Sequence, residues 1–339
     1  MSWLKPMPAN PVVAVAGATG AVGREMLLVL EQRDFPASQV RALASSRSAG
    51  STIPFRGGEL TVEEMTADSF AGVDIALFAA GGSISEQLRP AVVAAGAVMI
   101  DNSSAFRMED DVPLVVPEVN PTAVYSHSGV IANPNCSTIQ MVVALSPLHE
   151  VSPIKRVVVS TYQAASGAGA AGMEELYNQS RQFLDGEPLT VEKFAHQIAF
   201  NCIPHIDVFL DDGTTKEEWK MVAETQKILD PDIEVCANCV RVPVLRSHAE
   251  MINVEFIAPI SVEQAREAFE EAPGILVIDD PAEKAYPMPG LLAGTDATYV
   301  GRLRKDPSVK YGLNFWCVAD QLRKGAALNA VQIAELLLP

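Results

Sequence analysis

A cysteine at the start of a helical pattern is the residue best suited to covalent chemistry in this 339-residue chain. Residues 133–138 read Asn-Pro-Asn-Cys-Ser-Thr and lead into the apolar helical pattern TIQMVVALSPLHE, so Cys136 is predicted at or just before a helix N-terminus. A free thiol with a pKa of about 8.5 is only about 3% thiolate at pH 7, and a helix dipole and a nearby histidine would favour the thiolate. The alternative is a buried structural cysteine, the commoner role of this residue type.

Other ionisable side chains could assist such a nucleophile. His248 lies in RVPVLRSHAE, between two strand-like runs, in a segment that also carries Arg241 and Arg246. A histidine on a loop among arginines, in an acidic protein, suits an acid/base beside an anionic substrate. Glu217 and Lys220 share one face of a predicted helix. Taken singly, these side chains, and Arg107 in AFRMEDD, are better interpreted as ordinary solvated surface residues.

A glycine-rich loop near the start of the chain predicts a nucleotide site. GATGAVG at 17–23 follows a predicted strand and opens a predicted helix, with Gly17, Gly20 and Gly23 as a variant of the dinucleotide fingerprint. Glycine permits the tight turn, and the bare backbone lets a pyrophosphate approach the helix N-terminus. The alternative is a glycine-rich turn without a ligand.

The loop after the second strand favours NADP over NAD. NAD-binding folds place an Asp or Glu there for the ribose 2′-hydroxyl, whereas this chain has Ser45-Ser46-Arg47-Ser48. A guanidinium beside hydroxyls suits a 2′-phosphate, although Arg47 could also be a solvated loop residue. Gly81 and Gly82 end another strand of the same sheet and are plausible cofactor contacts.

Alternating strands and helices must position these groups. Strands are predicted at 12–16, 40–44, 74–79 and 97–101, with helices at 22–31 and 83–95 between them, which predicts a parallel sheet. The pattern changes near Asn133. Longer strands at 155–163, 250–257 and 299–303, a helix at 262–271 and a loop-rich insertion at 165–215 suggest an α+β domain, and an amphipathic helix at 324–337 could pack on the first domain.

Composition excludes several classes of protein. The net charge of −17 argues against nucleic acid and anionic membranes as partners, and no apolar run reaches the length of about 18 residues that a membrane span needs. Prolines at 6, 8 and 11 argue against a signal peptide, so a cytoplasmic location is expected. Five irregularly spaced cysteines fit reduced thiols, and the Cys236/Cys239 pair lacks a second pair for a metal site.

Segments from nearly the whole chain together resemble the aspartate-β-semialdehyde dehydrogenase family. Several are long and specific, which chance does not explain. They read GATGAVGREML, LASSRSAG, AGGSISEQ, IDNSSAFRMEDDVPLVVPEVN, ANPNCSTIQMV, STYQAASGAG, PHID, KEEWKMVAETQKI, CVRVPV…HAE and DQLRKGAALNAVQIAE.

The resemblance implies an α/β fold similar to glyceraldehyde-3-phosphate dehydrogenase. A Rossmann-type NADP-binding domain would span 1–133 and be completed by a C-terminal helix within 320–339. An α+β catalytic and dimerisation domain would span 134–319, and the chain would form a homodimer.

The resemblance also implies a role for individual positions. For catalysis and substrate binding these are the nucleophile Cys136, the acid/base His248, the acyl-orienting Gln163, Arg241 for the α-carboxylate, Glu217 for the amino group, Arg107 and Lys220 for phosphate, and the active-site Asn135. For the cofactor they are Gly17, Thr19, Gly20, Ala21, Val22, Gly23, Ser45, Arg47, Ser48, Gly81, Gly82, Ser166, Gly167, Asn314 and Gln321.

The implied reaction is reductive dephosphorylation of L-aspartyl-4-phosphate to L-aspartate-4-semialdehyde by NADPH through a cysteine thioester, in lysine, threonine, methionine and diaminopimelate biosynthesis. The nearest alternative is N-acetyl-γ-glutamyl-phosphate reductase, although a carboxylate at Glu217 favours a substrate with a free amino group. A catalytically inactive paralogue is the alternative from another class. Two departures from the family pattern are Ser51, where lysine is common, and Leu245-Arg246-Ser247, which adds a cation near His248.

Overall fold

The computed structural model describes residues 6–339, which fold as two compact units. One unit runs to Asn135 and also includes Ala326–Pro339, and the other is Cys136–Gly325. Both boundaries fall slightly later in the chain than the sequence suggests. None of the helices within residues 6–339 is long and apolar enough to cross a membrane.

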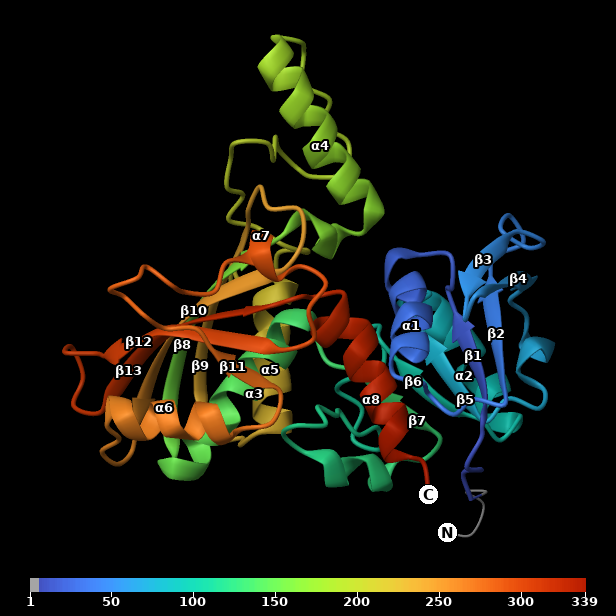
Figure 1. Cartoon of the computed structure of the whole chain (residues 1–339), viewed down its shortest axis with the longest axis horizontal. Helices are drawn as coiled ribbons and strands as arrows, with labels where there is room; N and C mark the ends of the chain where they lie inside the picture. Colours follow the sequence, from blue (N-terminus) through green and yellow to red (C-terminus); the bar gives the residue numbers. More distant parts are fainter. Residues whose placement is uncertain (1–5) are drawn as a thin grey trace. The chain divides into compact units, whose positions relative to one another are not determined.

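The first unit is built on a seven-stranded sheet with the order β3-β4-β2-β1-β5-β6-β7 (Figure 1). Every neighbouring pair is parallel except β3 and β4. β2 lies on one side of β1 and β5 on the other, so the strand order reverses between β1 and β5. Sheets of this kind bind ligands at such a point, outside the carboxyl ends of the strands. The strands are β1 (Val12–Ala16), β2 (Gln39–Ala44), β3 (Thr52–Phe55), β4 (Gly58–Glu64), β5 (Ile75–Phe78), β6 (Val98–Asp101) and β7 (Val130–Ala132).

Three helices complete this unit: α1 (Ala21–Gln32), α2 (Gly82–Ala94) and the C-terminal α8 (Leu328–Leu336). α8 follows a π-helical turn, Arg323–Ala327, and so begins later than the sequence pattern indicates. Val331 of α8 shares one apolar core with Leu27 of α1. Arg33 donates to both carboxylate oxygens of Glu335 at 2.7 Å, so the end of the chain is also held to the first unit by an ion pair.

The second unit contains a mixed six-stranded sheet with the order β11-β12-β13-β10-β8-β9. β8 is parallel to β9 and β11 to β12, and the other neighbours are antiparallel. The ladder is irregular at Glu255/Phe256 between β10 and β8 and between Gly301 and Arg304 in β12. The strands are β8 (Ile154–Gln163), β9 (Glu234–Arg241), β10 (His248–Phe256), β11 (Ile275–Val277), β12 (Thr298–Lys305) and β13 (Gly312–Ala319).

Helices α3 (Cys136–Val151), α5 (Lys216–Ile228) and α6 (Val262–Glu271) cover one face of this sheet, as Figure 1 shows, and a short helix α7 (Pro289–Leu292) lies near β13. Side chains of β8 alternate accordingly, since Val157, Val159 and Thr161 are buried while the residues between them are partly exposed. We call the other side the open face. It consists of Val158, Ser160, Tyr162, Met251, Asn253 and Trp316.

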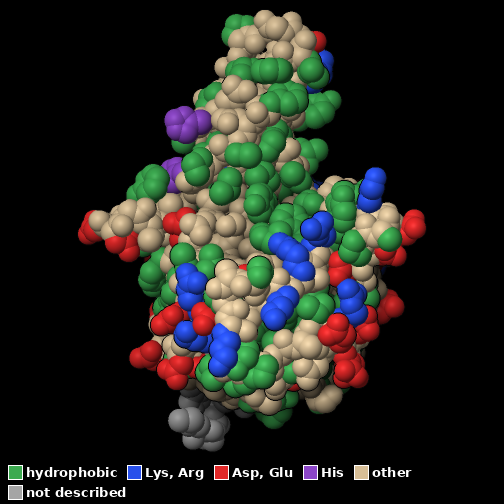
Figure 2. Space-filling model, turned by 90° about the vertical axis from the view of Figure 1, so that its left-hand side faces the viewer, with side chains coloured by type: hydrophobic (Ala, Val, Ile, Leu, Met, Phe, Trp, Pro, Cys, Tyr) green, Lys and Arg blue, Asp and Glu red, His purple; other side chains and the backbone are tan. Residues whose placement is uncertain are grey.

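The segment 165–215 is not the loop-rich insertion that its glycines and serines suggest, because it contains the 16-residue helix α4 (Ala170–Asp185). Its sequence signal is weak because polar contacts, rather than an apolar stripe, tie it to the loop that follows. Gln179 Oε1 accepts the backbone N–H groups of Ile198 and Ala199 at 2.9 and 3.1 Å. Hydrophobic side chains gather on the part of the second unit that carries α4 (Figure 2), and Tyr177, Phe183 and Leu184 of α4 are exposed.

Candidate active site

Cys136 is the first residue of α3, so its thiol lies at the positive end of a 16-residue helix, as the sequence predicts. The side chain is half-buried. Gly325 packs directly against it, because a Cβ added at Gly325 would lie 2.9 Å from Cβ and 3.3 Å from Cα of Cys136. The residue at 325 therefore fixes the room available to the thiol.

Three of the expected site residues form one row across adjacent strands. Gln163 ends β8 and pairs in register with Arg241 at the end of β9. His248 begins β10, level with Gln163, because the next residue, Ala249, pairs with Tyr162. All three side chains are buried on the helix-covered face. We call Arg241, Gln163 and His248 the catalytic row.

The backbone of Ala164 links two members of this row. Its N–H donates to Nδ1 of His248 at 3.0 Å, and its carbonyl accepts from Nη1 of Arg241 at 2.7 Å. Ala164 carries no functional side chain, so nothing in the sequence singles it out. It nevertheless sets the orientation of both the imidazole and the guanidinium.

His248 is fully buried and does not lie on an exposed loop, contrary to the expectation from sequence. Burial, and then the charge of Arg241, hold the pKa of His248 well below its usual range, so the ring is neutral. Because Nδ1 accepts the Ala164 N–H, the ring proton is on Nε2. Nε2 has no hydrogen-bond partner among residues 6–339 and can donate to a bound oxygen.

Arg241 is the cation of this site. Burial lowers the pKa of its guanidinium, and the charges of Glu217, Cys136 and Cys239 oppose that effect. The contribution from Cys136 means that the thiol and the guanidinium are near enough to interact. A cation beside the thiol favours the thiolate form of a nucleophilic cysteine.

The Glu217/Lys220 pair is largely buried and is not a solvated surface pair. Glu217 Oε2 contacts Lys220 Nζ at 3.1 Å, and Glu217 Oε1 accepts from Gln163 Nε2 at 3.2 Å, which joins the pair to the catalytic row. Lys220 also binds Asp207 at 2.7 Å. Burial lowers the pKa of Lys220, but the charge of Glu217 and the bond to Asp207 outweigh it and raise the pKa, so the lysine is cationic.

The start of α5 places this pair. Thr215 and Glu218 form a capping box, in which Thr215 Oγ1 accepts the Glu218 N–H at 3.3 Å and Glu218 Oε2 accepts the Thr215 N–H at 2.7 Å. The sequence T-K-E-E encodes this cap. It fixes Glu217 in the first helical turn.

Gly167 and Gln321, two of the residues expected at the cofactor, lie beside the catalytic row. A Cβ added at Gly167 would lie 2.6 Å from Nη1 of Arg241 and 3.1 Å from Nε2 of His248, so Gly167 keeps the space in front of both groups open. Gln321 accepts the Ser247 N–H at 2.8 Å and donates to Ser166 Oγ. Gln321 thereby joins the residue before His248 to the segment that follows β8.

Arg107 and Asn135 belong to the first unit. Arg107 is buried and donates to the carbonyls of Asn133 at 2.9 Å and Asn102 at 2.8 Å, which fixes its guanidinium close to the segment that leads into Cys136. The sequence reading missed Asn329 of α8. Its amide donates to the Asn133 side chain at 2.6 Å and to the Val115 carbonyl at 3.0 Å, and so supports the same segment.

The glycine-rich loop has the geometry of a phosphate-binding turn. Gly17 has a φ of +86°, and a Cβ there would lie 2.7 Å from the Ala79 carbonyl oxygen. At Gly23 a Cβ would lie 2.2 Å from the Gly17 carbonyl oxygen. The N-cap of α1 is Gly20, which offers no side-chain cap. No side chain at that position therefore competes with a phosphate for the first N–H groups of the helix.

The loop after β2 carries Arg47 as an exposed side chain. A turn holds the loop, in which the Ser48 N–H donates to the Ser45 carbonyl at 2.9 Å and Ser51 Oγ donates to the Ser48 carbonyl at 2.6 Å. Ser51, where the family often has lysine, therefore supports the loop. Gly81 follows β5 with a φ of +90° and is the N-cap of α2.

Asn314, which is expected at the cofactor, pairs with Asn253 of β10 on the side of the sheet opposite to the catalytic row. Arg246 is not an extra free cation, because its Nε donates to Asp320 Oδ2 at 2.6 Å.

The C-x-x-C pair has no shared chemistry. Cys236 is exposed and Cys239 is buried, since residues three apart on a strand point to opposite faces. Burial raises the pKa of the Cys239 thiol, and no cluster of potential metal ligands occurs among residues 6–339.

A substitution at Gly325 tests the packing around the nucleophile. We expect Gly325→Ala to lower kcat by about tenfold or more, because displacing a reacting atom by even part of an ångström is costly. Gly290→Ala is the matched control, since a Cβ there meets nothing within 4 Å. Steady-state kinetics would show the difference, and equal kcat values for the two variants would contradict the packing argument.

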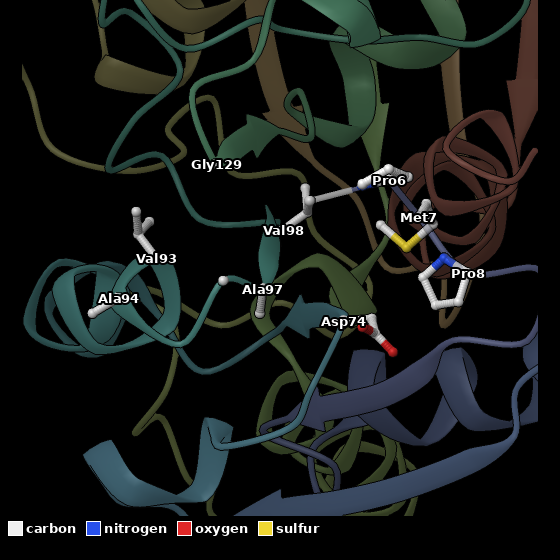
Figure 3. A pocket seen from close by; sticks show the side chains of 10 residues that line it. Pro6, Met7, Pro8, Asp74, Val93, Ala94, Ala97, Val98 and Gly129 are labelled. Atoms are coloured by element: carbon white, nitrogen blue, oxygen red, sulfur yellow. The ribbon is translucent and has the colours of Figure 1, made fainter. Parts of the chain in front are cut away.

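A separate pocket of about 270 Å³ lies at the amino ends of β5 and β6 (Figure 3). Asp74 immediately precedes β5, and Met7 and Pro8 come from the segment before β1. Asp74 Oδ2 accepts the Val12 N–H at 2.9 Å. This pocket lies at the amino ends of the strands, whereas the glycine-rich loop follows the carboxyl end of β1. It is therefore not the candidate nucleotide site.

Comparisons with known proteins agree with the two-unit architecture. Residues 12–127 match the semialdehyde dehydrogenase NAD binding domain, and residues 145–324 match the semialdehyde dehydrogenase dimerisation domain. The chain is 56% identical over 331 residues to aspartate-semialdehyde dehydrogenase of Aquifex aeolicus, covering 96% of this chain and 97% of that protein.

Comparison with solved structures leads to the same family. The structure of aspartate semialdehyde dehydrogenase II from Vibrio cholerae, complexed with ASA, superposes with a TM-score of 0.95 at 50% identity and covers 97% of this chain and 98% of that one. The NADP-bound enzyme from Candida albicans gives a TM-score of 0.74 at 26% identity, covering 97% and 98%. The chain, with its α/β nucleotide-binding unit and its dimerisation-type unit, belongs to the aspartate-semialdehyde dehydrogenase family of oxidoreductases.

Proposed function

We propose that this protein reduces L-aspartyl-4-phosphate to L-aspartate-4-semialdehyde with release of phosphate, through a thioester on Cys136. The observation that carries the proposal is the position of the thiol at the start of α3, where its charge acts on the pKa of the buried Arg241 guanidinium of the catalytic row. In this reaction the thiolate attacks the acyl carbon and phosphate leaves. A thioester accepts hydride far more readily than a carboxylate does, which is the reason for covalent catalysis here.

The buried charges suit a substrate that is also an amino acid. Arg241 offers a cation for the α-carboxylate, and Glu217, held by Gln163 and Lys220, offers a carboxylate for the ammonium group. The family resemblance assigns phosphate to Arg107 and Lys220. Lys220 already binds Glu217 and Asp207, so it would act by long-range charge and by positioning Glu217 as much as by direct contact.

His248 serves the acyl oxygen. As a neutral ring with its proton on Nε2, it donates a hydrogen bond to the oxygen that becomes negative in the tetrahedral intermediate. For the ring to accept a second proton, the Ala164 N–H would have to leave Nδ1, because Nδ1 would then carry hydrogen itself. The acid/base role implied by the resemblance therefore requires a small movement of the Ala164 peptide.

NADP is the proposed cofactor, and the residues present fit it. A Cβ at Gly17 or Gly23 would meet backbone atoms, so this tight turn before α1 requires glycine at both positions, and α1 has no side-chain cap that would compete with a phosphate. The exposed Arg47, beside Ser45 and Ser48, would bind the 2′-phosphate. When bound, NADPH supplies the hydride that reduces the acyl group. The NADP-bound relative from Candida albicans supports this choice.

Arg47→Ala tests the cofactor assignment. We expect NADP to bind about tenfold more weakly while NAD binding is unchanged, because one charge-assisted contact to an exposed phosphate is lost. Titration of both nucleotides against wild type and variant measures this. NADP affinity equal to that of wild type would remove Arg47 from the site.

We further propose that the protein works as a homodimer through the open face. That face combines apolar and small uncharged side chains, including Tyr162 and Trp316, whose ring centroids lie 5.3 Å apart. The match of residues 145–324 to a dimerisation domain supports a dimer formed through this unit. The product would then enter the biosynthesis of lysine, threonine, methionine and diaminopimelate, as the family resemblance implies.

One assay decides the function. We expect phosphate-dependent reduction of NADP with L-aspartate-4-semialdehyde, and at least about a hundredfold lower kcat/KM with N-acetyl-glutamate semialdehyde, whose blocked amino group cannot pair with Glu217. A preference for the acetylated substrate would instead identify N-acetyl-γ-glutamyl-phosphate reductase. No turnover of either would favour an inactive paralogue.

A further inference from the structure

A second polar row lies directly behind the catalytic row. Glu250 is two residues after His248 on β10, on the same helix-covered face, and it is fully buried. It pairs in register with Thr161 on β8 and with Cys317 on β13. Neither carboxyl oxygen has a hydrogen-bond partner of good geometry among residues 6–339. A fully buried carboxyl without a cation is rarely kept in a core unless it has a function.

Gln140 of α3 is the polar side chain that faces Glu250. It too is fully buried, and neither of its amide atoms has a well-formed hydrogen bond among residues 6–339. It is close enough to Glu250 to lower the pKa of that carboxyl. Gln140 is four residues after Cys136, so the two side chains lie on one face of α3, one turn apart. Its backbone carbonyl accepts the Cys317 thiol at 3.7 Å.

The surroundings keep Glu250 uncharged. Burial raises its pKa well above the usual range, and the nearby amide of Gln140 offsets this only in part. Its neighbours along the row are the thiols of Cys239 and Cys317, whose pKa values are raised chiefly by burial. The ionisable groups one row away are Arg241, Cys136 of α3 and the neutral His248. None of them shifts the pKa of Glu250. A protonated carboxyl can both donate to and accept from an amide.

We propose that Glu250 and Gln140 form a positioning pair, in which the neutral carboxyl binds the Gln140 amide and holds the first turns of α3 so that the Cys136 thiol faces the catalytic row. The pair touches no substrate and acts through the helix. Its kinetic consequences rest on the proposed function, and its effect on the thiol does not.

The test compares a conservative and a disruptive change at each position. We expect Glu250→Gln to keep kcat within about twofold of wild type, because an amide replaces the neutral acid at equal size. Glu250→Leu and Gln140→Leu should each lower kcat about tenfold or more with KM little changed, and the double variant should be no worse than either single one. Cys317→Val, which alters the same row at similar volume, is the matched control and should keep wild-type kcat.

A second readout is independent of turnover. The rate of alkylation of Cys136 by iodoacetamide at fixed pH, followed by mass spectrometry of its peptide, should fall in parallel with kcat in the two leucine variants. If Glu250→Leu does not fold, Gln140→Leu provides the same comparison. Leucine variants that match wild type in both readouts, or a Glu250→Gln variant as impaired as Glu250→Leu, would overturn the proposal. If wild type lacks turnover altogether, the proposed function fails while the alkylation rates still test the pair.

Discussion

Cys136→Ser should lose turnover by about 10⁴-fold or more, because a serine hydroxyl in this position has no base adjusted to activate it and cannot form the thioester. Binding of NADP should stay at the wild-type level, since the glycine-rich loop and Arg47 belong to the other unit. Pre-steady-state mixing with L-aspartate-4-semialdehyde, NADP and phosphate would measure the loss, and fluorescence titration the binding.

Two controls make this result specific to one thiol. Cys202→Ser removes an exposed cysteine and should leave kcat unchanged. Mass spectrometry of wild type mixed with substrate should find the acyl adduct on the peptide that contains residue 136, and substrate should protect that peptide from iodoacetamide. Turnover of Cys136→Ser near the wild-type value, or an adduct elsewhere, would remove the thioester mechanism.

Arg241→Leu should lower kcat/KM by about 10²- to 10³-fold, mostly through a higher KM, because a desolvated charge pair with the substrate carboxylate is worth several kcal/mol. Arg241→Lys should recover little of this. A lysine keeps the charge but cannot both donate to the Ala164 carbonyl and present a planar pair of N–H groups to the carboxylate. Steady-state kinetics with varied semialdehyde distinguish the two variants.

The matched control removes a positive charge from an exposed position of the same unit. Arg304→Leu on β12 should leave kcat and KM unchanged. If Arg241→Leu and Arg304→Leu gave similar kinetics, the carboxylate would have to bind elsewhere. A fall in kcat alone, with KM unchanged, would mean instead that Arg241 acts on Cys136 and not on the substrate.

The sequence predicts the central strands of the first unit to within about a residue, because buried parallel strands read as uninterrupted apolar runs. β1 is found at the predicted residues, and the ends of β2, β5 and β6 differ only slightly. β7 was missed because it has only three residues, and the β3–β4 hairpin because its residues are largely polar or exposed. α4 was missed because polar contacts to the loop that follows it, rather than an apolar stripe, hold it in place.

The site was predicted less completely than the fold. Residue types and family motifs lead to Cys136, His248 and Arg241, but the alignment of β8 beside β9, some 70 residues later in the chain, is not visible in either segment alone. The hydrogen bonds of the Ala164 backbone do not depend on its side chain, so the residue type does not predict them. The side of the sheet on which Asn314 lies is hidden for a related reason, since it follows from the strand register.

The ladder between β10 and β8 is irregular at Glu255/Phe256, at the end of β10 remote from His248, and the other irregularity of this sheet lies in β12, which does not neighbour β8 or β10. A residue gained or lost there can be absorbed by a local kink, whereas the same change in β8 close to Gln163 would send its amide to the opposite side. Related enzymes should therefore vary in length at the remote turns and keep a constant count between Val157 and Gln163. Loop grafting or the insertion of a reporter peptide is best directed to the turn between Lys305 and Gly312.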